Sequence, residues 1–227
     1  MRIGAIIQAR MSSRRLPGKV LRRIGGKPLL QFLLERLEHC SCLDQILVAT
    51  SVHESDTPIY DFCTDLGIPA YRGSLEDVAE RFLDVIDLYP LDAFVRLSAD
   101  SPLLDQHLVD KCVLFFEKGD YDLVTNVHPR TYPSGESVEV VRSSTFRRAY
   151  SSMVSHEDRE HVTMYFYRNS HDFSIHNFVS RTYLGDLHLA VDREEDLEVI
   201  RGILKKMTRP HWEYSLGELI KMYRGLS

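Results

Sequence analysis

Strand-like and helix-like segments alternate along the first half of this 227-residue chain, and the alternation limits its possible folds more than any other feature. Short apolar runs with β-branched residues predict strands at residues 3–8, 45–50, 69–71, 93–97 and 122–125. Apolar residues at helical spacing predict helices at about 28–40, 56–66, 75–89 and 106–117. We therefore expect an α/β fold with a mainly parallel sheet and helices on both faces.

The second half follows a looser pattern. Residues 128–137 contain two prolines and a glycine, which predict a loop. Strands are predicted at 138–142, 173–179 and 187–191, and helices at about 143–153, 160–168, 193–206 and 215–223. No internal repeat or shift of composition divides the chain, so we expect residues 1–227 to form a single domain.

Composition narrows the class of protein. Hydrophobic residues make up 44% of the chain, enough for a sizeable core. The net charge of -5 argues against a protein that coats nucleic acid, so any polyanion must bind in a local pocket. The four cysteines lack metal-site spacing, which predicts reduced, mostly buried thiols. No segment reaches the ~18 apolar residues of a membrane helix, and we expect a cytoplasmic protein that does not associate with a membrane.

The loop after the first predicted strand carries four cations, namely Arg10, Arg14, Arg15 and Lys19. Ligands of open α/β sheets bind beyond the carboxyl ends of the strands, so a nucleoside triphosphate is a natural partner for this loop. The alternative is a solvated basic loop. Ser13 stands where a Walker A motif requires glycine, and no G-x-G-x-x-G follows the strand. The loop is therefore a different kind of phosphate-binding segment.

Two aspartates follow predicted strands. Asp100 comes just after the strand at 93–97, and Asp192 comes just after the strand predicted at 187–191. Carboxylates at this edge of a sheet can share a Mg²⁺ ion with substrate phosphates. The alternatives are a turn ahead of Pro102 for Asp100 and a helix cap for Asp192. Asp105 is expected to be an N-cap, and the acids at 194–196 are expected to interact with a helix dipole.

Motifs in this order along the chain resemble the cytidylyltransferase family that includes CMP-KDO synthetase and acylneuraminate cytidylyltransferase, and especially its branch of SpsF-type spore-coat polysaccharide biosynthesis proteins. The resemblance runs nearly end to end. Its motifs are Gln8–Lys19, Gly26-Lys27-Pro28-Leu29-Leu30, Val48-Ala49-Thr50-Ser51, Arg72-Gly73-Ser74 with Asp77-Val78, Asp100-Ser101-Pro102, Thr131-Tyr132-Pro133, Val138-Glu139-Val140, Arg159-Glu160-His161-Val162-Thr163 and Val191-Asp192.

The resemblance implies a Rossmann-like nucleotide-diphosphosugar-transferase fold, CTP as the donor and Mg²⁺ as the cofactor. It implies that residues 127–185 form an acceptor-side and dimerisation insertion in a homodimer. The residues it implies to be catalytic are Lys19, Arg10, Arg15 and Asp100. The residues it implies to bind the metal are Asp100 and Asp192. The implied nucleotide-binding residues are Gln8, Ala9, Arg10, Ser12, Arg15, Lys19, Thr50, Ser51, Gly73, Ser74 and Asp77.

The acceptor side is less sharply defined. Arg159, Glu160, His161 and Tyr132 are candidates to bind the acceptor, because a basic side chain suits an anionic sugar and an imidazole can relay a proton. Their alternative is a helix start that ties a lid or dimer together, or, for Tyr132, core packing. Relatives often carry an aspartate where this chain has Ser137, so an acidic contact is missing there unless Glu136 substitutes.

The sequence thus predicts an enzyme that transfers CMP from CTP to a sugar or sugar-like acceptor and releases pyrophosphate. One alternative is a glycosyltransferase of related fold that uses a nucleotide sugar, but Asp100-Ser101-Pro102 lacks the paired aspartate of its usual metal motif. Another alternative is a non-catalytic nucleotide-binding protein. The retained Lys19, Asp100 and Asp192 argue against it.

Overall fold

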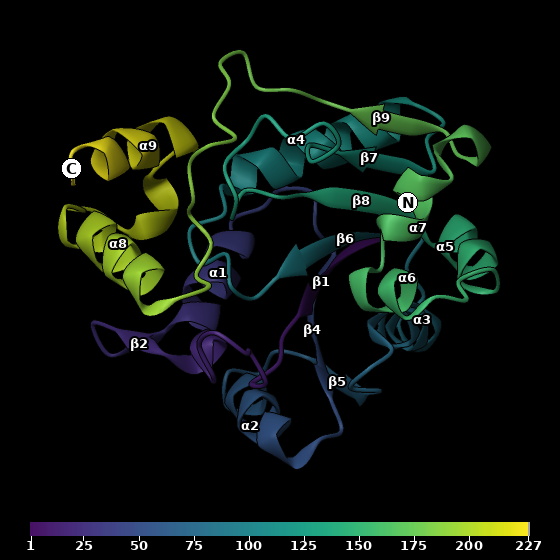
Figure 1. Ribbon diagram of the computed structural model, residues 1–227, viewed down its shortest axis with the longest axis horizontal. Coiled ribbons are helices and arrows are strands. Elements are labelled where there is room, and N and C mark those ends of the chain that lie inside the picture. Colours follow the sequence, from purple (N-terminus) through teal and green to yellow (C-terminus); the bar gives the residue numbers. More distant parts are fainter. Residues whose placement is uncertain (227) are drawn as a thin grey trace.

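The computed structural model describes residues 1–226, and its centre is a seven-stranded sheet of order β5-β4-β1-β6-β8-β7-β9 (Figure 1). The strands are β1 (Ile3–Gln8), β4 (Gln45–Ser51), β5 (Ala70–Gly73), β6 (Ala93–Ser98), β7 (Leu123–Thr125), β8 (Glu139–Arg142) and β9 (Ile175–Asn177). Only β8 runs antiparallel to its two neighbours. The mainly parallel α/β fold predicted from the sequence is confirmed.

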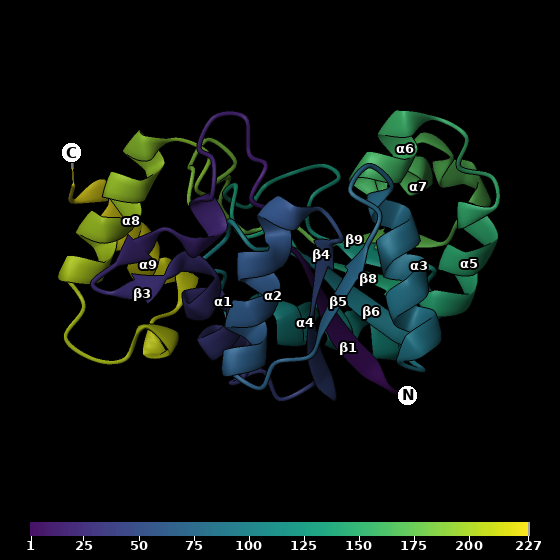
Figure 2. The same ribbon diagram turned by 90° about the horizontal axis from the view of Figure 1, so that it is seen from below.

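Helices cover both faces of the sheet, as predicted. One face packs on α1 (Leu29–Leu37), α2 (Thr57–Asp65), α4 (Gln106–Lys118), α8 (Glu194–Lys205) and α9 (Leu216–Arg224). The other face packs on α3 (Val78–Leu88), α5 (Ser143–Tyr150), α6 (His156–His161) and α7 (Met164–Arg168). Figure 2 shows α2 and α3 on opposite sides of β5.

The strands are buried on both faces because their side chains alternate between two apolar clusters. In β1, Ala5 and Ile7 belong to the cluster beneath α1 and α4, whereas Ile6 belongs to the cluster beneath α3 and α5. This two-sided burial explains why the strands appear in the sequence as continuous apolar runs rather than as alternating ones.

Short elements complete the segment after β1. A 3₁₀ turn at Lys19–Leu21 leads into a small hairpin of β2 (Arg23–Ile24) and β3 (Lys27–Pro28). Gly25 and Gly26 connect these strands with φ angles of 58° and 84°, a backbone that favours glycine. Pro28 belongs to β3, so the helix predicted from residue 28 begins at Leu29 instead.

Two predictions in the second half were wrong. Residues 187–191 form no strand but an extended segment with a single bridge, between Ser134 and His188. Leu189 and Val191 are buried there by core packing, and a short buried apolar run does not by itself require a sheet neighbour. The helix predicted at 160–168 is interrupted by Val162, whose φ angle of 57° ends α6 and separates it from α7.

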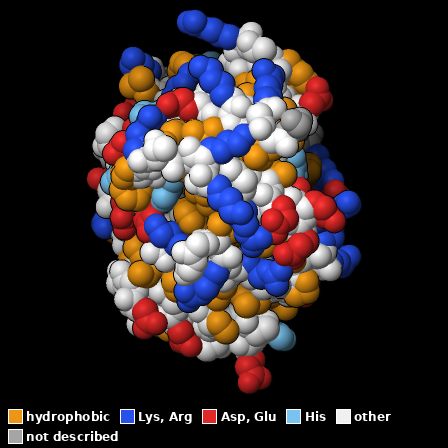
Figure 3. Space-filling model, turned by 90° about the vertical axis from the view of Figure 1, so that its left-hand side faces the viewer, with side chains coloured by type: hydrophobic (Ala, Val, Ile, Leu, Met, Phe, Trp, Pro, Cys, Tyr) orange, Lys and Arg blue, Asp and Glu red, His pale blue; other side chains and the backbone are white. Residues whose placement is uncertain are grey.

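Basic side chains gather on the face formed by α8, α9 and the hairpin, although the chain is acidic overall (Figure 3). A cavity of about 450 Å³ lies on this face, between the hairpin and α8. Three of its basic side chains already have acidic partners: Lys27 pairs with Glu35, Arg201 with Glu198 and Arg209 with Glu218. No helix within residues 1–226 is long and apolar enough to cross a membrane.

All four cysteines are free, as predicted. Cys63 and Cys112 are buried, whereas Cys40 and Cys42 are half-buried. Burial raises the pKa of the Cys63 thiol to about 12, so that thiol stays protonated at neutral pH and packs as a small apolar group.

Candidate active site

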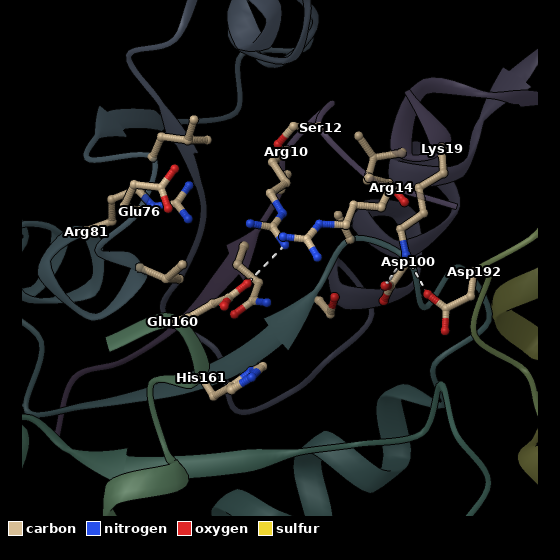
Figure 4. A pocket seen from close by; sticks show the side chains of 18 of the residues that line it. Arg10, Ser12, Arg14, Lys19, Glu76, Arg81, Asp100, Glu160, His161 and Asp192 are labelled. Atoms are coloured by element: carbon tan, nitrogen blue, oxygen red, sulfur yellow. Dashed lines mark hydrogen bonds and ion pairs between the residues drawn. The ribbon is translucent and has the colours of Figure 1, made fainter. Parts of the chain in front are cut away.

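A cavity of about 760 Å³ opens at the carboxyl ends of β1 and β6 (Figure 4). The loop after β1 forms one wall, and the start of α3, the end of β6 and helix α6 form the others. Ten of the residues predicted for the site line it: Gln8, Ala9, Arg10, Ser12, Arg15, Lys19, Asp100, Glu160, His161 and Asp192. The structure thus brings these candidate residues, which are far apart in the chain, to one cavity.

Lys19 lies between the two predicted metal ligands. Its Nζ is 2.6 Å from Asp100 Oδ2 and 2.9 Å from Asp192 Oδ1. Arg15 also contacts Asp192, with an Nη2–Oδ2 distance of 2.9 Å. Burial alone would raise the pKa of Asp192, but its hydrogen bonds to Lys19 and Arg15 hold that pKa below its usual value. The carboxylate is therefore ionised at neutral pH and available to a cation.

Backbone contacts bring these groups together. The Gly18 amide donates to the Met11 carbonyl at 2.8 Å and closes the loop ahead of Lys19. Gly18 has a φ angle of 70°, a conformation that side-chain-bearing residues seldom adopt. The Val191 amide donates to the Asp100 carbonyl at 2.8 Å. This bond, rather than a strand, places Asp192 beside Asp100.

The remaining loop cations also face the cavity. Arg10 Nη2 is 3.3 Å from Glu160 Oε1 on α6, and this ion pair spans the cavity. Arg14 extends into the same cavity (Figure 4) and has no acidic partner within 4.0 Å in the described part of the chain. It is therefore free to meet an anion.

Arg81 is a site residue that the sequence interpretation missed. It lies on α3 at the end of the cavity away from Asp100 and Asp192 (Figure 4), and only 1% of it is exposed. Within residues 1–226 its Nε and Nη1 atoms have no hydrogen-bond partner. Burial lowers its pKa to about 10, against the opposing effect of Asp56. A buried, charged and unpaired guanidinium is costly, and its position points to an absent polar ligand.

The sequence did hold a signal for Arg81. It is three residues after Val78 and four before Val85, so it lies on the buried apolar face of the helix. A cation on that face needs a partner. Gly73 allows it to fit, because a Cβ at Gly73 would come within 2.8 Å of Arg81 Cγ.

Five predicted nucleotide-binding residues do not line the cavity, namely Thr50, Ser51, Gly73, Ser74 and Asp77. Ser51 Oγ lies 2.5 Å from Asp56 Oδ2, and Asp56 Oδ1 accepts a hydrogen bond from the Met11 amide at 2.7 Å. Ser51 thus holds the Asp56 side chain, which in turn holds the backbone of the loop at Met11. Thr50 is buried beside it, and Ser74 accepts from the Asp77 amide at 3.0 Å. These contacts position the loop and α3 rather than a ligand.

Asp77 and Arg159 pair with each other outside the cavity. Asp77 caps α3 by accepting from the Glu80 amide at 2.8 Å, and its other oxygen lies 2.7 Å from Arg159 Nη1. The pair joins α3 to α6. The structure therefore gives Arg159 the tying role that was its alternative. Tyr132 is likewise buried in the core, edge-on to Phe178.

Glu136 does not replace the acid missing at Ser137. It is fully buried, its Oε2 accepts from the Asp105 amide at 2.9 Å, and burial raises its pKa to about 8. Ser137 Oγ instead accepts from Arg130 Nη1 at 3.0 Å. Asp105 caps α4 as predicted, by accepting from the His107 amide at 3.0 Å.

The donor set fits a magnesium ion. Asp100 and Asp192 present carboxylate oxygens to one point, now held by the Lys19 ammonium. Mg²⁺ prefers oxygen ligands and is commonly bound through one or two carboxylates together with substrate phosphates. No cluster of three or more His, Cys, Asp or Glu side chains offers a closed metal cage in residues 1–226. Such an open site suits a metal that arrives with its substrate.

Comparison with known proteins decides the family. The family model described as Cytidylyltransferase matches residues 4–211. This chain belongs to the cytidylyltransferase family. It is therefore a CTP-dependent nucleotidyltransferase, as predicted from the sequence, and not a glycosyltransferase.

Individual relatives support the same family. The chain is 33% identical to the spore coat polysaccharide biosynthesis protein SpsF of Bacillus subtilis, over 96% of this chain and 92% of that protein. It is 33% identical to the 3-deoxy-manno-octulosonate cytidylyltransferase of Syntrophotalea carbinolica, over 50% of this chain and 44% of that protein.

Solved structures share the fold. A cytidylyltransferase from Leptospira borgpetersenii superposes with a TM-score of 0.94 at 29% identity, covering 100% of this chain and 95% of that one. CMP:2-keto-3-deoxy-manno-octonic acid synthetase in complex with CTP gives a TM-score of 0.70 at 20% identity, covering 91% and 99%. The second likeness concerns the fold alone.

Arg81→Met is expected to weaken CTP binding about ten- to hundredfold, because an unmade hydrogen bond to a charged group costs about 1.5–3 kcal/mol. The same substitution is expected to raise the melting temperature, since it removes a buried charge that has no partner. Calorimetric titration with CTP and thermal unfolding measure the two effects. A variant that loses stability together with affinity would make Arg81 a purely structural residue.

Proposed function

We propose that this cytidylyltransferase transfers CMP from CTP to a hydroxyl of a sugar or sugar-like acceptor and serves surface polysaccharide or glycan assembly. The observation that carries the proposal is the gathering of four loop cations and two aspartates around one cavity. The names of the relatives, a spore coat polysaccharide protein and an octulosonate cytidylyltransferase, support an acceptor of this class.

The cationic loop would hold the triphosphate. An acceptor oxygen attacks the α-phosphorus, the bond from that phosphorus to the bridging oxygen breaks, and pyrophosphate leaves. Negative charge builds on the phosphate oxygens during this step, so catalysis consists mainly of positioning and electrostatic stabilisation. Lys19, Arg10 and Arg15 line the cavity, and each has a carboxylate partner. Their cationic groups would stabilise the charge that develops on the leaving pyrophosphate.

Asp100 and Asp192 would hold Mg²⁺, which when bound supplies a Lewis acid for the α-phosphate. Asp100 is fixed by its place at the end of β6, and Asp192 by the bond between Val191 and Asp100. Their convergence on one cation supports this assignment.

The opposite end of the cavity suits the base and ribose. Arg81 offers unpaired guanidinium nitrogens, and Gln8 offers a buried Oε1 without a partner in residues 1–226. Ala9 and the start of α3 form the adjoining wall. A pyrimidine base presents both acceptors and donors, so this pair of side chains can distinguish its polar edge from that of other bases.

Glu160 and His161 would meet the acceptor, because both line the cavity at the end of α6. The exposed His161 imidazole would accept the proton of the attacking hydroxyl. Arg159 forms an ion pair with Asp77, so we expect Glu160 and His161 to bind the acceptor without it.

Pyrophosphate release tests the proposed function directly. The purified chain is incubated with each of the four nucleoside triphosphates and Mg²⁺, against keto-deoxy acids, nonulosonic acids, amino sugars and phosphorylated small molecules. CTP with one of these acceptors is expected to give pyrophosphate. Release from UTP alone, or from none of the combinations, would reject the proposal.

We further propose a cytoplasmic homodimer that is joined through residues 127–185. This segment exposes three large apolar side chains, Val154 at 89%, Tyr183 at 62% and Val179 at 53%. A contact between two copies that covers these side chains would remove apolar surface from water.

Val154→Asp is expected to convert the dimer to a monomer, because it places a charge in the proposed contact. Light scattering after size-exclusion chromatography measures the mass. Leu88→Asp is the matched control, since Leu88 is 61% exposed but lies outside the segment. A wild-type monomer, or equal dissociation of both variants, would contradict the proposed interface.

A further inference from the structure

Lys19 occupies the point at which the two proposed metal ligands converge. Its Nζ donates to Asp100 at 2.6 Å and to Asp192 at 2.9 Å, and only 11% of its side chain is exposed. These are the hydrogen bonds its ammonium makes in the described chain, so both carboxylates share one buried cation. Figure 4 shows the ammonium directed between them.

We propose that Lys19 is the resident counter-ion of the Asp100–Asp192 pair and keeps divalent metal out until a triphosphate draws its ammonium away. The inference rests on the proposed function, because it takes these two carboxylates as metal ligands. It adds that one cation replaces another: the lysine leaves the carboxylates for a phosphate, and the metal takes its place.

The electrostatic argument follows from the contacts. A divalent ion entering beside an ammonium meets strong like-charge repulsion at such short range. Moving Lys19 aside without a phosphate leaves a nearly buried ammonium without an acceptor, which is unfavourable. A triphosphate supplies that acceptor. Metal affinity and phosphate affinity are therefore coupled, and by linkage the coupling acts equally in both directions.

Arg15 cannot serve as the same barrier. It also pairs with Asp192, but 56% of its side chain is exposed, and it makes no ion pair with Asp100 within residues 1–226. Water screens its charge more than that of Lys19. The exchange is thus specific to Lys19, the one cation that bridges both carboxylates within residues 1–226.

Metal binding without nucleotide tests the inference. Lys19→Met keeps the length of the side chain but removes its charge, and it is expected to bind Mn²⁺ at least about tenfold more tightly than the wild type. Electron paramagnetic resonance of free Mn²⁺ measures the affinity. Lys27→Met is the matched control, because Lys27 pairs with Glu35 far from the cavity. It is expected to leave Mn²⁺ affinity unchanged.

Adding Asp192→Asn to Lys19→Met is expected to abolish the gain. Equal Mn²⁺ affinity in the wild type and Lys19→Met would overturn the inference, as would a gain that persists in the double variant. Thermal unfolding gives a parallel readout: Mg²⁺ should raise the melting temperature of Lys19→Met but not that of the wild type.

The wild-type protein allows a test that needs no variant. Nitrogen-15 spectra of lysine side chains detect an ammonium held by carboxylates. The Lys19 signal is expected to stay in place with millimolar Mg²⁺ alone and to shift when metal-free CTP is added. A shift with Mg²⁺ alone would overturn the inference.

These measurements separate the inference from the proposed reaction. If Lys19→Met binds Mn²⁺ more tightly while the wild type releases no pyrophosphate from any triphosphate, the exchange is supported and the reaction is rejected. Pyrophosphate from CTP without tighter metal binding would support the reaction and reject the exchange.

Discussion

Lys19→Ala is expected to lower kcat for pyrophosphate release about 10²–10³-fold, the usual cost of removing a preorganised charge from a transition state. The ammonium lies in the cavity with only 11% of its side chain exposed, so water cannot replace it efficiently. Negative charge on the leaving pyrophosphate grows as the reaction proceeds, and for this reason kcat should fall more than the KM for CTP rises.

The loss in Lys19→Ala cannot come from a lost metal, because removing Lys19 leaves both carboxylates in place and free of their competing cation. Steady-state kinetics at saturating Mg²⁺ and CTP measure the effect. Lys27→Ala is the matched control and should keep full turnover, since Lys27 lies on the β2–β3 hairpin outside the cavity. Turnover of Lys19→Ala above a tenth of the wild-type value would show that Lys19 is not a catalytic residue.

Asp100→Asn is expected to lower kcat by a similar factor of about 10²–10³. The substitution removes the negative charge that would bind Mg²⁺, and the amide that replaces it is a poor ligand for this ion. Asp120→Asn serves as the control, because the Asp120 side chain is fully exposed and contacts only Arg142 at the surface. Melting temperatures of both variants exclude a general loss of folding.

Replacement of the metal distinguishes a ligand from a merely structural carboxylate. Asp100→Cys introduces a thiolate, which binds soft metals better than Mg²⁺. Its turnover should be very low with Mg²⁺ and should recover with the soft metal Cd²⁺, whereas the wild type should prefer Mg²⁺. Failure of every metal to restore turnover, in a variant that is folded and binds CTP, would reject Asp100 as a metal ligand.

Periodicity predicted the architecture of the first half well. The strand predicted at 3–8 is β1, and the helix predicted at 106–117 is α4 with one more residue. These segments succeed because local pattern and tertiary packing agree. Residues 187–191 failed for the opposite reason: their apolar side chains are buried against the core without a partner strand.

Chain position predicted which of the candidate residues lie together at one cavity. The basic loop and Asp100 follow strands whose carboxyl ends meet at one edge of the sheet, so their proximity follows from topology. The sequence could not show that the Arg159 guanidinium pairs with Asp77, the N-cap residue of α3. Arg81 was missed because the helical pattern was interpreted only for its apolar members.

The sequence by itself determined that this chain forms a mainly parallel α/β sheet and which charged residues stand at the strand ends, because both depend on local periodicity and chain order. Only the tertiary structure decided which charges meet. The contact of Lys19 with Asp100 and Asp192 depends on a backbone bond between two distant segments. Arg81 is buried on α3, and two of its guanidinium nitrogens have no hydrogen-bond partner in residues 1–226. Such contacts are fixed by packing in three dimensions, which a linear pattern does not encode.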